Sequence, residues 1–250
     1  VILPCKSVKK MSVSLEKREL FCMLDTETIY LKKRVYELAF SVYDSVTCDI
    51  VESHKFYVKE TLESALFYFL RHQKMPIFWP NRLNVIDCLK QSITWQAAID
   101  SMLLVLKKHD IKNIIAHNVS FDVSAIYKTS ELYCEESQYN KMFDFLSSLN
   151  KLELSGFFVH GLPEGLAYLL PHKAKSGCAT FKADFLCPTL LGVSQNHDAL
   201  SDCANQIQLY KIALANSGIY KHCGTIYGNM KMFHEVQYEN ARRLGTGELE

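Results

Sequence analysis

The chain is organised around one short segment, residues 20–28, which reads LFCMLDTET. Its first five residues form an unbroken apolar run, as expected of a central strand buried on both faces. Two acidic residues, Asp25 and Glu27, follow the run directly. Alternate residues of a strand point to the same face, so we expect the two carboxyl groups to lie side by side. The segment therefore predicts a buried strand with a pair of acidic side chains at its end.

A pair of carboxylates at this spacing needs a physical reason, because two ionised groups repel and packing does not require them there. A divalent cation that prefers hard oxygen ligands, Mg²⁺ or Mn²⁺, would make the pair a binding site. A solvated strand end is the structural alternative, and an isolated D-x-E match does not exclude it. Other parts of the chain must therefore decide between the two.

A third carboxyl group follows another short apolar segment, in residues 114–122 (IIAHNVSFD). The pattern predicts a buried strand over residues 111–117 and a helix that Ser120 caps and that runs to about Leu132. Asp122 then lies in the first turn of this helix. The helix dipole alone favours an acidic residue at that place, so Asp122 has a structural alternative to a catalytic role.

A fourth carboxyl group and a histidine occur together in residues 196–203 (NHDALSDC). If the whole segment were helical, His197 and Asp202 would lie about 140° apart around the axis. They converge better if Asp198 caps the helix and leaves His197 on the preceding loop. A loop histidine beside a helical carboxylate suits a general base next to a metal ligand. A capping aspartate with an exposed histidine is the structural alternative.

The rest of the pattern indicates one α/β domain. Residues 35–43 and 49–57 predict two further strands, which form an antiparallel meander with the first. Residues 60–110 are mainly helical in pattern, and a last helix is expected over residues 198–215. We expect a flexible arm over residues 1–18, the domain over 19–217 and a C-terminal extension over 218–250.

The composition limits the class of protein. Of 250 residues, 48% are hydrophobic and 22% are charged, which argues against a disordered or fibrous chain. No apolar run approaches the roughly 18–20 residues that span a bilayer, so we expect no membrane partner. Nine cysteines without a C-x-x-C pair suggest reduced thiols and a cytoplasmic protein. With a net charge of +1, any contact with nucleic acid must come from a local patch.

Taken together and in order, the three acidic segments resemble the motifs of the DEDDh 3′→5′ exonuclease family. Its D-x-E motif is matched by Asp25 and Glu27, its H-N-x-x-F-D motif by residues 117–122, and its H-x-A-x-x-D motif by residues 197–202. The family includes the proofreading subunit of the bacterial replicative polymerase, ribonuclease T and oligoribonuclease. The resemblance covers about residues 20–215.

The resemblance implies a ribonuclease H-like α/β fold with a five-stranded mixed sheet flanked by helices. Three antiparallel strands come first and two parallel strands follow. On this comparison, residues 142–144 resemble the strand after the second motif.

The resemblance also implies a mechanism, in which two divalent cations, Mg²⁺ or Mn²⁺, promote hydrolysis of a phosphodiester bond. Asp25 would bridge both ions, Glu27 and Asp202 would complete the site of the catalytic ion, and Asp122 would hold or position the second. His197 would help one ion to activate the attacking water. The products would be 5′-mononucleotides released from a 3′ end.

The implied substrate is nucleic acid with a 3′ end, with single-stranded DNA or RNA as the expected form. The implied substrate-binding residues are Thr28, Ile29, Asn118 and Phe121, although Phe121 is also expected to pack beneath the site. Ile29 and Tyr30 replace the Thr-Gly step that often follows the family's first motif, which affects how a terminal base would be held. The sequence does not choose between DNA and RNA.

Two other classes of function remain open on the sequence. One is a ribonuclease H-like adaptor or polymerase-associated binding module that has lost catalysis, and the other is an endonuclease of the same fold. The complete set of five residues argues for the exonuclease. A homodimer or a polymerase partner is left open by the sequence alone.

Overall fold

The computed structural model describes residues 19–29, 34–72, 85–155, 158, 182–195 and 197–215. The predicted arm over residues 1–18 and the predicted extension over 218–250 lie outside the described residues.

A five-stranded mixed sheet forms the centre of the fold, in the order β3-β2-β1-β4-β5. The strands are β1 (Leu20–Ile29), β2 (Arg34–Asp44), β3 (Ile50–Tyr57), β4 (Asn113–Ala116) and β5 (Asn150–Glu153). β1, β2 and β3 pair antiparallel, whereas β4 runs parallel to β1 and β5 parallel to β4. This arrangement confirms the predicted meander followed by two parallel strands.

The first apolar run is buried on both faces, as its sequence predicted. Met23 packs in a cluster with residues of α8 (Ala183–Leu186) and α9 (Ala199–Ala215). Cys22 and Leu24 pack in a cluster with residues of α3 (Trp95–Lys108), α4 (Val119–Tyr133) and α5 (Glu136–Ser148). Odd-numbered residues of β1 therefore face α9, and even-numbered residues face the opposite helical layer.

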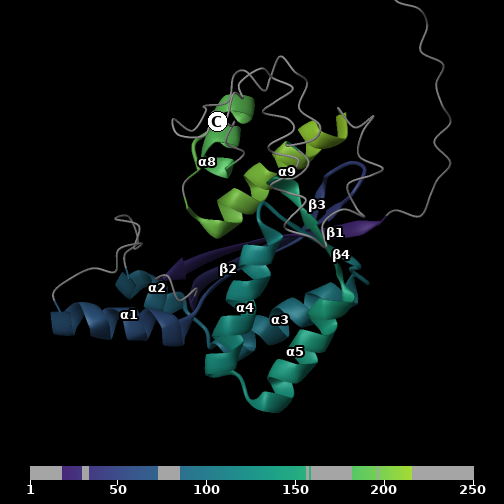
Figure 1. The fold of residues 1–250 in the computed structure, drawn as a ribbon. Coiled ribbons are helices and arrows are strands. Elements are labelled where there is room, and N and C mark those ends of the chain that lie inside the picture. Colours follow the sequence, from purple (N-terminus) through teal and green to yellow (C-terminus); the bar gives the residue numbers. More distant parts are fainter. Residues whose placement is uncertain are drawn as a thin grey trace, which may run out of the picture.

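Helices cover both faces of the sheet. They are α1 (Lys59–His72), α2 (Val85–Gln91), α3 (Trp95–Lys108), α4 (Val119–Tyr133), α5 (Glu136–Ser148), α8 (Ala183–Leu186), the π-helix η1 (Cys187–Leu191) and α9 (Ala199–Ala215). α8 and α9 lie on one side of the sheet, and α3, α4 and α5 lie on the other (Figure 1). Of the helices described, none combines the length and the apolar character that crossing a membrane requires.

Two local expectations were wrong. Residues 142–144 belong to α5 and not to a strand, because Met142 and Leu146 are spaced one helical turn apart and both are buried. The strand after the second motif is β5, which begins after α5 ends. Asn118, not Ser120, caps α4, since its side-chain oxygen accepts a hydrogen bond from the Phe121 N–H at 3.1 Å.

Candidate active site

The site lies at the carboxyl end of β1. Because β4 runs parallel to β1, the carboxyl ends of both strands meet at one edge of the sheet, where α4 begins. Asp25 and Glu27 project from β1 toward α9, and the ladder to β2 shifts register immediately after Glu27. Register shifts re-aim side chains, and they are common beside active sites. The pair of carboxyl groups predicted from the sequence is thus placed side by side on one face.

The loop before α9 brings His197 to this pair. Asp198 caps α9. Its Oδ1 accepts a hydrogen bond from the Ser201 N–H at 2.9 Å, and its backbone carbonyl accepts one from the Asp202 N–H at 2.8 Å. His197 therefore precedes the helix, as predicted. Its φ of 52° lies in the left-handed region, which is uncommon for a residue other than glycine and is found at functional sites.

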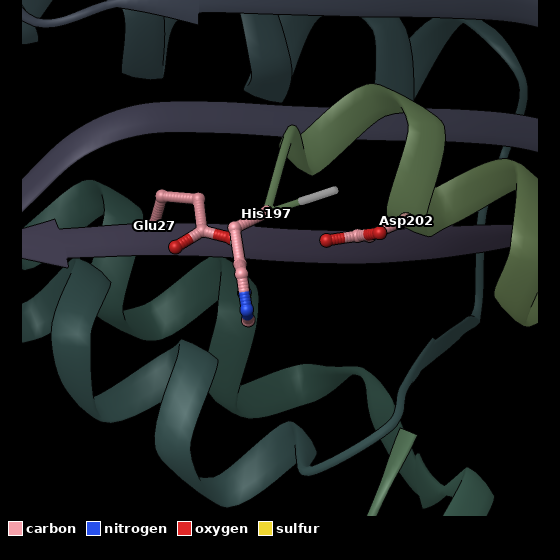
Figure 2. Close-up of side chains that lie close together, drawn as sticks. All are labelled: Glu27, His197 and Asp202. Atoms are coloured by element: carbon pink, nitrogen blue, oxygen red, sulfur yellow. The ribbon is translucent and has the colours of Figure 1, made fainter. Parts of the chain in front are cut away.

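Glu27, His197 and Asp202 converge from three different places in the chain. His197 Nδ1 lies 3.8 Å from Glu27 Oε1, and one ligand atom from each of the three residues falls within 4.8 Å of the others. Figure 2 shows the side chains approaching from β1, from the loop and from the first turns of α9. Asp202 is buried, Glu27 is half-buried and His197 is exposed. The arrangement leaves the imidazole open to solvent beside two carboxyl groups.

Asp25 lies next to this cluster and is held by a residue that the sequence did not single out. Gln206 Nε2 donates a hydrogen bond to Asp25 Oδ1 at 2.8 Å. Gln206 lies one helical turn after Asp202, on the same side of α9. That spacing is the signal by which it could have been found.

Asp122 reaches the site from the opposite helical layer. Its Oδ1 accepts two hydrogen bonds from Thr26, one from the backbone N–H at 2.9 Å and one from the hydroxyl at 2.7 Å. Thr26 is the even-numbered residue between Asp25 and Glu27, so it faces α4. The central residue of the first motif therefore fixes one oxygen of Asp122.

Glu37 and Lys55 hold the start of α9 and were not expected from the sequence. Glu37 is the cross-strand partner of Glu27, is fully buried, and accepts a hydrogen bond at Oε1 from the Ala199 N–H at 2.9 Å. Lys55 Nζ lies 2.6 Å from Asp198 Oδ2 and 3.8 Å from Glu37 Oε1. The signal for Glu37 was a glutamate in the middle of an apolar strand, since charged side chains are rarely buried without partners.

The residues predicted to bind substrate lie around the same edge. Thr28 and Phe121 are half-buried. Ile29 is fully buried and packs in a cluster that includes Leu62. Asn118 uses its side-chain oxygen to cap α4. Their contact with substrate stays a prediction.

The carboxyl groups are destabilised in their ionised forms by burial and by one another. Burial raises the pKa of Asp25 well above its usual range, and the charges of Asp122, Glu27 and Asp202 raise it further. Burial, followed by the charge of Asp202, raises the pKa of Glu27 to about 8. Burial likewise raises the pKa of Asp122 to about 7, against the two hydrogen bonds from Thr26.

Such a group of acids fits a divalent cation. Oxygen donors from buried carboxylates, with one imidazole beside them, are ligands for Mg²⁺ or Mn²⁺. A cation would offset both the burial and the mutual repulsion that disfavour the ionised carboxylates. The residues that would hold it are Asp25, Glu27, Asp122 and Asp202.

Comparison with known proteins adds the fold but no close relative. No protein-family model matches the sequence, and no curated protein matches it significantly. Among solved structures, the nuclease domain of 3'hExo, a DEDDh family member bound to rAMP, is 13% identical with a TM-score of 0.53, over 84% of this chain and 96% of that one.

Exonuclease I of E. coli is a second structural neighbour. Its complex with a dT13 oligonucleotide is 15% identical with a TM-score of 0.54, over 80% of this chain and 42% of that one. A further structure of exonuclease I gives a TM-score of 0.57 at 16% identity, with the same coverage. This chain thus spans less than half the length of exonuclease I. The order of its strands agrees with these matches, and the chain has the ribonuclease H-like α/β fold of these exonuclease structures.

Proposed function

We propose that this protein is a 3′→5′ exonuclease, which hydrolyses phosphodiester bonds of DNA or RNA from the 3′ end and releases 5′-mononucleotides. The observation that carries the proposal is the convergence of Glu27, His197 and Asp202 in an exonuclease fold. Asp25 and Asp122 complete the set of acids at the same strand end. A structural site would not need four buried or half-buried carboxyl groups so close together.

The residues of the chain have separate roles in the proposed reaction. Asp25, Glu27, Asp122 and Asp202 would hold two divalent cations, Mg²⁺ or Mn²⁺. His197, exposed beside Glu27, would accept the proton of the attacking water as a general base. Cations bound there would polarise the phosphodiester and lower the pKa of nearby water.

The nature of the nucleic acid is suggested by the neighbours in only a general way. One of them is bound to rAMP and another to a dT13 oligonucleotide. We therefore propose that single-stranded 3′ ends are accepted, and that the choice between DNA and RNA depends on contacts with the 2′ position of the sugar.

The test uses matched single-stranded and double-stranded DNA and RNA oligonucleotides with a 5′ label. With Mg²⁺ or Mn²⁺ we expect a ladder that shortens one nucleotide at a time from the 3′ end, and no cleavage in a chelator. Asp202→Asn removes a buried acid of the site and should abolish the ladder. Asp144→Asn, a change of an exposed residue on α5, is the matched control and should leave it intact.

Two other results would contradict the proposal. Fragments that appear first at internal positions would indicate an endonuclease. Intact oligonucleotides after long incubation with either cation would indicate a binding module without catalysis.

A further inference from the structure

Gln206 is a fully buried amide that makes two hydrogen bonds to different parts of the site. Only 1% of its surface is exposed. Its Nε2 donates to Asp25 Oδ1 at 2.8 Å, and its Oε1 accepts from the His117 N–H at 3.0 Å. One side chain on α9 thereby joins β1 to the turn between β4 and α4.

The orientation of this amide is fixed by its partners. A backbone N–H can only donate, so the atom that faces His117 must be the Oε1 oxygen. The Nε2 group, which can only donate, then faces Asp25, and Asp25 Oδ1 must accept. The hydrogen bond therefore favours the ionised form of Asp25, against the burial that raises its pKa.

The same geometry controls which part of Asp25 remains for other ligands. Gln206 occupies one direction at Oδ1 and limits rotation of the carboxylate. Thr26 does the same for Asp122, whose Oδ1 accepts both of its hydrogen bonds. Each of the two acids thus has one oxygen held by a neutral donor, which leaves the other oxygen for a cation.

We propose that Gln206 is a positioning residue of the active site, which orients the Asp25 carboxylate toward the divalent cations and sets α9 at the correct distance from β1. The inference rests on the proposed function only in that Asp25 is a cation ligand. Asp202 lies one turn earlier on α9, so the same side chain also fixes the spacing between these two acids.

The test compares Gln206→Met and Gln206→Glu with Gln208→Met. Methionine has a similar length and removes both hydrogen bonds, whereas glutamate keeps the acceptor for His117 and, in its ionised form, has no donor for Asp25. Gln208 is exposed on the same helix and serves as the matched control. The two readouts are the dissociation constant for Mn²⁺, which needs no substrate, and kcat and KM on a single-stranded oligonucleotide.

We expect both changes at position 206 to weaken Mn²⁺ binding or to lower kcat by roughly 10–100-fold, as is typical when a partner of a ligand is removed. KM for the oligonucleotide should stay near the wild-type value, because the Gln206 side chain is buried and offers almost no surface to a substrate. Gln208→Met should behave as the wild type in both readouts.

The inference would be overturned if the variants at position 206 kept the wild-type Mn²⁺ affinity and the wild-type kcat per folded molecule and showed only a lower melting temperature. Gln206 would then be a structural contact and nothing more. A wild-type protein that binds Mn²⁺ but cleaves no oligonucleotide would contradict the proposed function, while the binding measurement would still decide the role of Gln206. If Gln206→Met fails to fold, Gln206→Glu at a pH where it is ionised tests the loss of the donor to Asp25 with the His117 hydrogen bond retained.

Discussion

His197 stands apart from the other residues of the site because its side chain is exposed and its backbone is unusual. Its imidazole lies 3.8 Å from Glu27, and its φ is 52°. A residue in the left-handed region that places a titratable ring beside a half-buried acid is a candidate for a functional role. The four carboxyl groups, by contrast, come from two strand-end positions and two helix starts.

His197→Ala should separate these two roles. We expect turnover to fall by a factor on the order of 10²–10⁴, the usual contribution of a general base. Mn²⁺ binding should survive, because the carboxyl groups remain. Steady-state kinetics on a labelled oligonucleotide and Mn²⁺ titration of the same samples check both parts. Turnover equal to that of the wild type would remove His197 from the role of base.

The sequence singled out the acids and the histidine that the structure brings together, but not the residues that hold them. Asp25 and Glu27 are two residues apart, and His197 and Asp202 are five apart, so each motif can be recognised within a short segment of the sequence. Gln206 contacts an acid 181 residues earlier in the chain, and Glu37 contacts a backbone N–H 162 residues later. Hydrogen bonds over such separations depend on how the elements pack, which local patterns do not encode.

The start of α9 is the element on which the geometry of the site depends most. Asp198 caps the helix and pairs with Lys55, and Glu37 accepts from the first N–H of the helix. Together these contacts fix the residues that follow His197. The loop is therefore anchored on its helical side by its own Asp198 and by one side chain each from β2 and β3.

Asp198→Ala should destabilise the protein by roughly 1–2 kcal/mol, since loss of an N-cap carries about this effect. The midpoint of urea unfolding gives the measurement. Asp144→Ala removes an exposed aspartate from α5 and provides the control, with a change close to zero. Equal midpoints for Asp198→Ala and the wild type would mean that the cap contributes nothing to the fold.

At the scale of elements, the strands of the meander and the last helix were predicted because their apolar patterns are long. The prediction failed for residues 142–144, where three residues were matched to a short family strand. Met142 and Leu146 bury one face of a helix instead, and β5 follows with only four residues, Asn150–Glu153. A strand this short carries too little pattern to be separated from a helix end.

For the whole molecule, the raised pKa values connect stability to pH. Glu27 has a pKa of about 8 in the folded state and Asp122 of about 7, both above the roughly 4 of an unfolded chain. Over this range the folded state binds more protons than the unfolded state, so its stability falls as pH rises. Hydrogen bonds from three partners lower the pKa of Glu52 to about 2. Glu52 therefore changes charge only well below the range from about pH 5 to about pH 8.

In a chelator, the free energy of unfolding should therefore decrease as pH rises from about 5 to about 8. Mn²⁺ should remove most of this decrease, because a bound cation favours the ionised carboxylates. The part that remains is expected from Glu37, whose pKa burial raises to about 7 and which is not one of the proposed ligands. Urea unfolding at several pH values, with and without Mn²⁺, is the measurement. Stability that is constant or rises over this range in the chelator would contradict it.

The overall topology followed from the sequence because three features agreed: a central strand buried on both faces, a meander after it, and three motifs in a fixed order. The distribution of helices between the two faces of the sheet could not be predicted from the sequence. It depends on the even and odd residues of β1, which place Met23 against α9 and Leu24 against the opposite layer. Both faces read as equally apolar in the sequence.

A calorimetric titration with Mn²⁺ tests most directly whether the carboxyl groups of Asp25, Glu27, Asp122 and Asp202 form a metal site. The wild-type protein should bind Mn²⁺, Asp202→Asn should weaken that binding by about tenfold or more, and Asp144→Asn should leave it unchanged. Binding of equal strength in Asp202→Asn and the wild type, or no binding in the wild type, would contradict a metal site at this strand end.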